Sequence, residues 1–502
     1  SMVKISANRI DLETKRLERA QLRNYTETLV SVTASATTTL DLSTGNIFDL
    51  THGTNITTLT LSNVPASGTL CSITIIRTKD ATGTARTITW PASFKWPQGT
   101  APTLTQTTGA IDVIVATTKN GGTTWFATVA GQAVAAVPVQ GLWAWGSDPS
   151  YNGKLGKGGV MNYSTPSQIG ALLTWSQASA STYHSGAIKA DGTLWMWGDN
   201  SKGSLGHGLS GGGTGRSSPV QIGALTTWSQ LSLGRMCSAA IKSDGTLWTW
   251  GANSGGQLGI GSTGNAYSPV QVGALTNWAQ VSAGGKSNIT YGGHMVAIKT
   301  DGTLWAWGKN NVGQLGRGNT TDYSSPVQVG ALTTWAQVST DAGGYHNLAV
   351  KTDGTLWAWG KNGWGQLGDG STTDKSSPVQ VGALTTWSKV AAGGHHSLAI
   401  KMDGTLWSWG YGANGLLGRG NVTPYSSPVQ VGALTTWSSI NCGYQFSHGI
   451  KTDGTLWAWG RNYRGQLGLG DTANRSSPVQ VGVATNWGSV SGGLHHALAV
   501  NA

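Results

Sequence analysis

Five histidines share one position of a repeating unit, and a ring of imidazoles is the most suggestive chemistry in this sequence. The two remaining copies of the unit carry Cys237 and Phe446 at that position, and the histidines are His184, His294, His346, His396 and His496. Imidazole is a common ligand of Zn²⁺. Residues placed one per repeat around a ring nevertheless lie too far apart to hold a single ion, and a phenylalanine cannot ligate one. We therefore expect no metal site and no cofactor, and we predict that each imidazole hydrogen-bonds a neighbouring backbone group.

Carboxylates are the other groups that could do chemistry, because glycoside hydrolysis usually requires two of them at a set separation. Residues 138–502 contain no Glu, and six of their 13 Asp precede Gly in a repeated turn. The other Asp residues are scattered over polar loops, without a nucleophile elbow or a phosphate-binding glycine loop. We therefore predict that the protein is not an enzyme, and a polysaccharide-degrading activity is kept only as a weaker alternative.

Cationic and aromatic residues that depart from the repeat gather in the loops between the repeated motifs. The candidate ligand-binding residues are Tyr151, Lys309, Lys361, Trp364, Tyr411, Arg461, Tyr463 and Arg464. Trp364 is the only one of the 25 tryptophans that neither the repeats nor the N-terminal region explains. Aromatic rings stack on sugar faces, and Arg or Lys binds phosphate or carboxylate, so these loops suit an anionic glycan. The alternatives are solvated loops without a ligand and nucleic acid, which is not the expected partner.

The elements that must position these loops follow from a repeated Leu-Trp-x-Trp-Gly motif. Its seven copies have successive spacings of 52, 53, 57, 52, 50 and 50 residues, and they begin at Leu142, Leu194, Leu247, Leu304, Leu356, Leu406 and Leu456. Repeats of this length indicate a closed or stacked array. Each unit holds four short apolar runs, and the Asp-Gly pair between two of them is typical of a tight hairpin. The sequence predicts an all-β fold: a seven-bladed β-propeller over residues 136–502, with four antiparallel strands per blade and a ring closed by the C-terminal strand.

Antiparallel strands place alternate connections on opposite faces of such a ring. The Asp-Gly turns and the GALTTW connections fall on one face, and the long loops with the candidate residues fall on the other. The chain enters the propeller just before Gly141, where the other blades have their Asp-Gly turn. Recognition residues accumulate on loops that a rigid scaffold holds, so the face with the long loops is the predicted binding face.

The repeating pattern GxxHxxAL…DGxLWxWG…GQLG resembles that of the regulator of chromosome condensation repeat, and the resemblance covers residues 141–502. It implies the propeller fold and says much less about activity, because one architecture hosts unrelated functions. Some members of that family promote nucleotide exchange on a small GTPase and bind chromatin, using a wedge-like insertion beside the repeats. The extra residues in this chain are short, so exchange activity is not expected.

Residues 1–135 differ from the propeller in composition. Ser1 and Met2 are interpreted as an expression scar, residues 3–24 are predicted to form an N-terminal helix, and the Thr-rich and Val-rich residues 25–135 are predicted to form a small β-sandwich. The stretches TWPASFKWPQGTAPTL and GGTTWFATVAG resemble a small β-domain of bacteriophage tail and fibre proteins. This resemblance implies that residues 25–135 serve virion attachment and oligomerisation.

These features together predict a bacteriophage tail fibre or virion appendage whose propeller tip binds a host surface component, above all an anionic glycan. The alternative is a purely structural virion decoration protein. The expected partners are a bacterial surface glycan or other envelope receptor, other virion proteins bound through residues 1–135, and copies of the same chain, with a homotrimer favoured. The protein would be located in the virion after assembly in the host bacterial cytoplasm.

The overall composition fits a turn-rich β protein, with 75 Gly and 11% charged residues among 502. Because no run of 18 apolar residues occurs, we expect no membrane span. The three cysteines stand in unrelated contexts and indicate no disulfide framework.

Overall fold

A computed structural model describes most of the chain, which divides into two compact units, residues 1–137 and residues 138–502. The described residues are 29–80, 84–96, 101–106, 110–135, 140–148, 153–159, 161–170, 174–211, 213–285, 293–340 and 345–501. The predicted scar at residues 1–2 and the predicted helix over residues 3–24 lie outside these ranges. Within them, no helix is long and apolar enough to cross a membrane.

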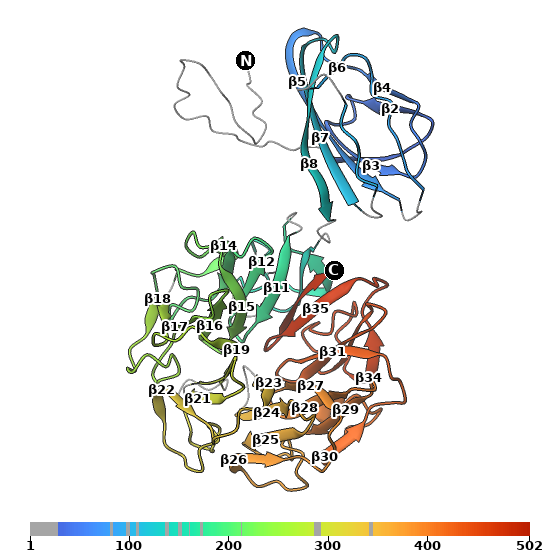
Figure 1. Cartoon of the computed structure of the whole chain (residues 1–502). Coiled ribbons are helices and arrows are strands. Elements are labelled where there is room, and N and C mark those ends of the chain that lie inside the picture. Colours follow the sequence, from blue (N-terminus) through green and yellow to red (C-terminus); the bar gives the residue numbers. More distant parts are fainter. Residues whose placement is uncertain are drawn as a thin grey trace. The chain divides into compact units, whose positions relative to one another are not determined.

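The second unit is a ring of seven four-stranded antiparallel sheets, which we number as blades 1 to 7 (Figure 1). Blade 1 contains β11 (Trp175–Ala180), β12 (His184–Lys189), β13 (Leu194–Gly198) and β14 (Arg216–Gln221). Blade 2 contains β15 (Trp228–Leu233), β16 (Cys237–Lys242), β17 (Leu247–Gly251) and β18 (Ala266–Gln271). Blade 3 contains β19 (Trp278–Gly284), β20 (His294–Lys299), β21 (Leu304–Gly308) and β22 (Tyr323–Gln328).

The remaining blades repeat this arrangement. Blade 4 contains β23 (Trp335–Thr340), β24 (His346–Lys351), β25 (Leu356–Gly360) and β26 (Lys375–Gln380). Blade 5 contains β27 (Trp387–Ala392), β28 (His396–Lys401), β29 (Leu406–Gly410), the short 3-10 helix η1 (Ala413–Gly415) and β30 (Tyr425–Gln430). Blade 6 contains β31 (Trp437–Cys442), β32 (Phe446–Lys451), β33 (Leu456–Gly460) and β34 (Arg475–Gln480). Blade 7 contains β35 (Trp487–Gly492), β36 (His496–Asn501), β9 (Leu142–Gly146) and β10 (Tyr163–Gln168).

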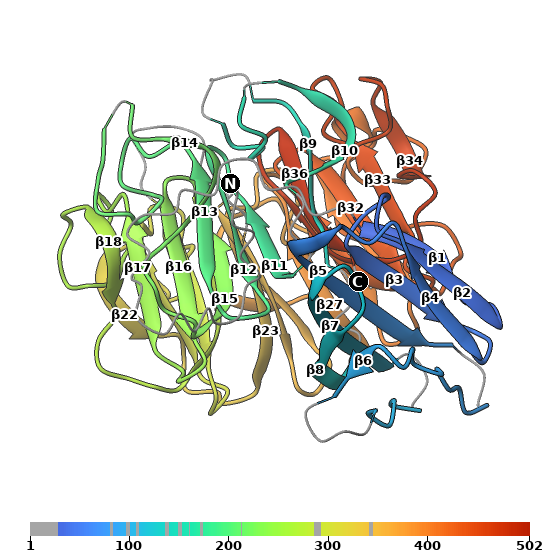
Figure 2. The same ribbon diagram turned by 90° about the horizontal axis from the view of Figure 1, so that it is seen from above.

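Blade 7 closes the ring by joining the two ends of the propeller sequence. β36 pairs antiparallel with β9, with Leu498 opposite Ala144, and Figure 2 shows the two strands side by side. The predicted closure by the C-terminal strand is confirmed. Each blade nevertheless begins with the Trp-led run, so the fourth apolar run of one sequence repeat belongs to the following blade.

The Asp-Gly turns are fixed by local hydrogen bonds. In the turn of blade 1, the Asp191 carboxylate accepts hydrogen bonds from the backbone N–H of Thr193 at 2.9 Å and from its hydroxyl at 2.7 Å. The Thr193 hydroxyl in turn accepts one from the indole N–H of Trp195 at 2.9 Å. The same three bonds recur in the turns of blades 2 to 6. The six turn aspartates therefore have a structural role.

Neighbouring blades are joined by buried tryptophans. The second tryptophan of each Leu-Trp-x-Trp-Gly motif is fully buried, and its indole N–H donates to a backbone carbonyl of the adjacent blade at 2.8–3.0 Å. Each indole thus combines a large buried apolar area with a satisfied donor. The seven repeats are held together by the residues that define the motif.

The first unit contains two sheets around one core. The six-stranded sheet has the order β1-β3-β5-β7-β8-β6 and the two-stranded sheet pairs β2 with β4. The bounds are β1 (Leu29–Thr33), β2 (Thr37–Asp41), β3 (Ile47–His52), β4 (Thr58–Ser62), β5 (Ser67–Lys79), β6 (Phe94–Lys95), β7 (Ala110–Asn120) and β8 (Trp125–Ala135). Leu40, Phe48 and Ile75 from both sheets are fully buried in the shared core. β1, β3 and β5 pair in parallel, a feature that alternating Thr and Val residues do not reveal.

Candidate functional site

The predicted binding residues occupy three positions of one repeated loop, which connects the third and fourth strands of a blade. Lys309, Lys361, Tyr411 and Arg461 each follow the glycine that ends a Leu-Trp-x-Trp-Gly strand. Trp364 and Arg464 share a second position, and Tyr151 and Tyr463 share a third. We call the face that carries these loops the loop face, and the opposite face the Asp-Gly face.

Buried amides hold each loop in shape. In blade 4 the Asn362 carbonyl accepts from the backbone N–H of Leu367 at 3.0 Å, and the Gln366 carbonyl accepts from the backbone N–H of Trp364 at 2.9 Å. Blade 6 repeats the second bond between Gln466 and Arg464 at 2.9 Å. The side chains at the loop tips are therefore presented by a rigid backbone.

Two loops from adjacent blades bring Trp364 and Tyr411 together. The ring centroids lie 4.5 Å apart with planes tilted by 50°, although the residues belong to blades 4 and 5. Trp364 is 47% exposed. A tryptophan that stays half exposed while it contacts another ring provides an apolar surface for a partner.

The blade 6 loop forms a second aromatic and cationic group around Tyr463. The guanidinium carbons of Arg461 and Arg464 lie 4.0 Å and 5.2 Å from the centroid of the Tyr463 ring. The Tyr463 hydroxyl lies 3.2 Å from the ring nitrogens of His495, which comes from blade 7. Arg461 also donates to the side-chain carbonyl of Gln445.

The sequence reasoning missed three residues beside these groups, namely His495 next to Tyr463, His395 next to Tyr411, and Tyr444 next to His395. The centroid of the His395 ring lies 6.2 Å from that of Tyr411 and 5.4 Å from that of Tyr444. We name the surface formed by these residues the loop-face strip; it consists of Trp364, Tyr411, His395, Tyr444, Arg461, Tyr463, Arg464 and His495. His395 and His495 directly precede the inner histidine of their blades, at a position where Tyr183 and Tyr345 also stand, and Tyr444 lies two residues before Phe446. That recurrence of rings was a signal in the sequence.

Positively charged side chains surround the blade 7 end of the strip. Burial lowers the pKa of His495 to about 3, and the charges of Lys154, Arg464 and Arg461 lower it further. Burial also lowers the pKa of Lys154 to about 8, against the opposing effect of Asp148. The charges of Lys154, Arg464 and Arg461 disfavour a further positive charge at His495, so a negatively charged group would be favoured beside them.

Three predicted residues are not part of the strip. The ammonium of Lys309 in blade 3 binds the carboxylate of Asp322 at 2.6 Å. Lys361 follows β25 at the base of the loop that carries Trp364. Tyr151 lies outside the described residues. From the predicted set, the structure therefore brings together Trp364 with Tyr411, and Arg461 and Arg464 with Tyr463.

The recurring histidines form links between blades. Each Nε2 atom pairs with a side chain of the next blade at 2.8–2.9 Å: His184 with Ser238, His294 with Asn347, His346 with Ser397, His396 with Ser447, and His496 with Ser185. The prediction that each imidazole hydrogen-bonds a backbone group was wrong for Nε2, because this atom reaches a side chain across the blade interface. Among the described residues, no group of three or more His, Cys, Asp or Glu could hold a metal ion.

The family models that match this chain describe the same repeats. The model for the RCC1-like domain matches residues 292–502, and that for the regulator of chromosome condensation (RCC1) repeat matches residues 191–241 and 244–290. A second model for the RCC1 repeat matches residues 175–204. The propeller is therefore an RCC1-repeat β-propeller, and the resemblance of its repeats to this family is confirmed.

Curated relatives are about a third identical to this chain over the aligned residues. The ultraviolet-B receptor UVR8 of Arabidopsis thaliana is 32% identical over 255 residues, which are 50% of this chain and 56% of the relative. The mitochondrial RCC1 domain-containing protein RUG3 of the same plant is 32% identical over 217 residues, 42% of this chain and 47% of the relative. The human E3 ubiquitin-protein ligase HERC2 is 32% identical over 38% of this chain and 4% of its own length. The chain spans about half or less of the length of these relatives.

Solved structures share the fold at lower identity. Human WBSCR16 has a TM-score of 0.63 and 23% identity, and the match covers 72% of this chain and 98% of that one. Prp20p of Saccharomyces cerevisiae has a TM-score of 0.61 and 21% identity, and the match covers 73% of this chain and 92% of that one. These likenesses establish the architecture.

The relatives contradict the predicted bacteriophage protein, since they are plant, human and yeast proteins. The tail fibre or virion appendage, the structural virion decoration protein, the virion location and the assembly in a bacterial cytoplasm were wrong. The bacterial surface glycan and the virion partners were wrong as well, and the expected homotrimer loses its basis. The error arose because short N-terminal stretches were given more weight than repeats that occupy most of the chain. The resemblance of residues 25–135 to phage fibre domains lies outside the matched ranges and stays a prediction.

Proposed function

We propose that the propeller is a non-catalytic protein-binding module that docks an acidic protein surface on the loop-face strip. Trp364, Tyr411 and Tyr463 would supply the apolar contacts, and Arg461 and Arg464 would bind carboxylates of the partner. The observation that carries this proposal is the strip itself, a set of rings and cations contributed by four different blades.

The composition of the strip supports this function. Trp, Tyr and Arg are the residue types most enriched in the energetically dominant parts of protein interfaces. Planar guanidinium groups bind carboxylates in a bidentate fashion. Residues 138–502 carry 21 Lys and Arg against 13 Asp, and this excess favours acidic partners over basic ones.

The relatives support a role in protein recognition. The structure of yeast Prp20p is described together with its binding to Gsp1p and histones, and another structure shows yeast RCC1 (Prp20) with Kap60 bound. HERC2 is a ubiquitin-protein ligase, a class of enzyme that acts on proteins. A propeller of the same repeats is suited to hold a protein partner in this chain.

Site-specific photo-crosslinking tests the proposal. A photoreactive phenylalanine analogue replaces Trp364, Tyr463 or, as the control, Met402, which is 67% exposed at an Asp-Gly turn. We expect one protein to be crosslinked from the two strip positions and not from the control position. The affinity of that purified protein for the full chain should fall at least tenfold in the double variant Trp364→Ala, Arg464→Ala, and it should be unchanged in Met402→Ala. Equal capture from Met402, or unchanged affinity in the double variant, would refute docking on the strip.

A further inference from the structure

Grooves open between adjacent blades beside the connections that lead into the Trp-led strands on the Asp-Gly face, and none of the strip residues lines them. Three of them have equivalent linings, at blades 7 and 1, 2 and 3, and 5 and 6. Each lies between the outer strand of one blade and the Trp-led strand of the next. We name the one between blades 5 and 6 the Trp437 groove; it has a volume of about 300 Å³ and is lined by Arg419, Val431, Leu434, Trp437, Lys451 and Pro478, among others.

The Trp437 groove contains buried hydrogen-bond donors without partners. Trp437 is only 4% exposed, and its indole N–H has no acceptor. The Nε and Nη1 atoms of Arg419 are also buried and have no acceptor. An unsatisfied buried donor destabilises the fold, and a charged one does so more strongly. Three such donors at one groove point to a ligand that supplies acceptors.

Arg419 distinguishes this groove from its equivalents. The indole N–H without a partner recurs in the Trp-led strand of all seven blades, so by itself it belongs to the scaffold. Lys or Arg stands at the position of Arg419 in only two other repeats, as Lys157 and Arg317. Those two donate to the backbone carbonyls of Gln168 and Gln328 in their own blades. Arg419 lies over the ring of Tyr425, 4.8 Å from its centroid, as Lys157 lies over Tyr163, but its Nε and Nη1 atoms have no acceptor.

The charge and the walls of the groove define the chemistry of its ligand. Lys451 adds a second cation, with its ammonium 3.5 Å from the centroid of Trp457 and 5.2 Å from that of Trp437. Burial lowers the pKa of Lys451, and Asp453 opposes this effect. The Asp453 carboxylate is already bonded to Thr455. The groove therefore suits a ligand with two neighbouring side chains. One is apolar and packs on the apolar walls, and the other is acidic and pairs with the two cations.

We propose that the Trp437 groove binds an extended acidic peptide segment in which an apolar residue adjoins an aspartate or glutamate. The apolar side chain packs on Val431, Leu434 and Pro478. The neighbouring carboxylate accepts hydrogen bonds from Arg419, and a peptide carbonyl accepts one from the indole of Trp437. Leu434 is 50% exposed, so this wall is open to solvent and accessible to a peptide.

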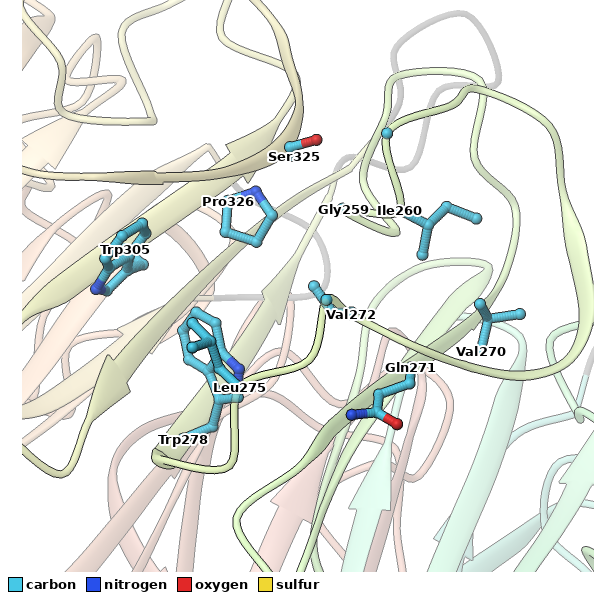
Figure 3. Close-up of a pocket in the computed structure, with 12 residues that line it drawn as sticks. Gly259, Ile260, Val270, Gln271, Val272, Leu275, Trp278, Trp305, Ser325 and Pro326 are labelled. Atoms are coloured by element: carbon cyan, nitrogen blue, oxygen red, sulfur yellow. The ribbon is translucent and has the colours of Figure 1, made fainter.

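The groove between blades 2 and 3 provides a natural comparison (Figure 3). Trp278, Trp305, Leu275 and Pro326 occupy the places of Trp437, Trp457, Leu434 and Pro478, and the volume is about 440 Å³. Ile260 stands in the place of Arg419. This groove keeps the apolar walls and the indole donor but lacks the guanidinium. Because Lys299 keeps the place of Lys451, we expect this groove to prefer the acidic peptide at least tenfold less than the Trp437 groove does.

The test uses the full chain with ¹⁵N-labelled tryptophan side chains and follows the indole N–H signals by NMR. The signals of Trp437 and Trp278 are assigned from Trp437→Phe and Trp278→Phe variants. The probe is a pool of acetylated hexapeptides in which Leu alternates with Asp, and the control pool contains Asn in place of Asp. We expect the Asp pool to shift the Trp437 signal in a saturable manner, with at least tenfold higher affinity than the Asn pool. The shift should be weakened at least tenfold by Arg419→Ala and unaffected by Arg317→Ala.

Three outcomes would overturn the proposal. They are an unchanged Trp437 signal at millimolar Asp peptide, equal affinities for the Asp and Asn pools, and a shift that persists in Arg419→Ala. A response to oligothymidylate that depends on Arg419, without one to the Asp pool, would assign the groove to nucleic acid and equally overturn it. The variant Trp364→Ala should leave the peptide response intact. A failure of the proposed docking on the strip can therefore be distinguished from a failure of the proposed peptide binding in the groove.

Discussion

His448 offers a sharp test of how the propeller core is stabilised. It is fully buried in β32, and neither of its ring nitrogens has a hydrogen-bond partner. Its ring contacts those of Phe446 and Trp145, with centroids 5.3 Å and 5.6 Å away. Blades 4, 5 and 7 carry leucine at the equivalent position, as in Leu398. We therefore expect His448→Leu to stabilise the propeller.

The magnitude follows from the unsatisfied nitrogens and from proton linkage. Removing buried polar atoms without partners should stabilise the fold by about 1–3 kcal/mol at pH 7. Burial lowers the pKa of His448 from 6.5 to about 3. The unfolded state therefore binds more protons than the folded state between these two values, and stability is lost as the pH falls through that window. At pH 5 this loss is about 2 kcal/mol per histidine, and the leucine variant avoids it.

Guanidinium unfolding followed by tryptophan fluorescence at pH 7 and pH 5 measures both effects. The advantage of His448→Leu should grow by about 2 kcal/mol between the two pH values. The matched control is His396→Leu, because His396 bonds Ser447 across the blade interface at 2.8 Å. That variant should be less stable than the native chain at pH 7 by about 1–3 kcal/mol. A destabilised His448→Leu variant at pH 7, or an advantage that does not grow at pH 5, would refute the reasoning.

Two further predictions concern the turns and the first unit. Gly354→Ala should cost roughly 3 kcal/mol or more, because the Gly354 φ is +77° and an added Cβ would lie 2.1 Å from the Thr385 carbonyl oxygen. Gly382→Ala, with φ at +65° and open space, should cost only about 1 kcal/mol, and equal thermal shifts in the two variants would argue against the steric cause. Asp112→Ala should cost about 3–5 kcal/mol, because Asp112 and Arg77 form a fully buried ion pair at 3.1 Å. Hydrogen exchange of the β5 and β7 amides measures this loss, and unchanged protection would contradict it.

The propeller could be predicted from the sequence because the motifs that define its turns and strands are short and repeated. An Asp-Gly pair followed by Thr fixes a hairpin within five residues, as in the turn that begins at Asp191. The spacing of the Leu-Trp-x-Trp-Gly motifs gave the number of blades, and strand alternation gave the two faces. The chain's entry on the Asp-Gly face is visible in the bridge between Gln140 and Thr174.

The candidate site could be predicted only in part, because its contacts join loops of different blades. Trp364 and Tyr411 were identified separately as departures from the repeat, and their 4.5 Å contact depends on the distance between blades. His395 was passed over because a second histidine beside the inner one looked like part of the same structural ring. The function was predicted wrongly because it was inferred from short N-terminal stretches, which say little about what a propeller surface binds.

The amino-acid sequence by itself determined the strand order, the turns and the sorting of loops onto two faces, since each depends on residues a few positions apart. Only the tertiary structure decided which side chains meet across a blade interface. It paired His396 with Ser447, placed Tyr463 against His495 and left Arg419 without an acceptor. The physical reason is that such pairs are some 30 to 50 residues apart in the chain, and their distances are set by the packing of whole blades.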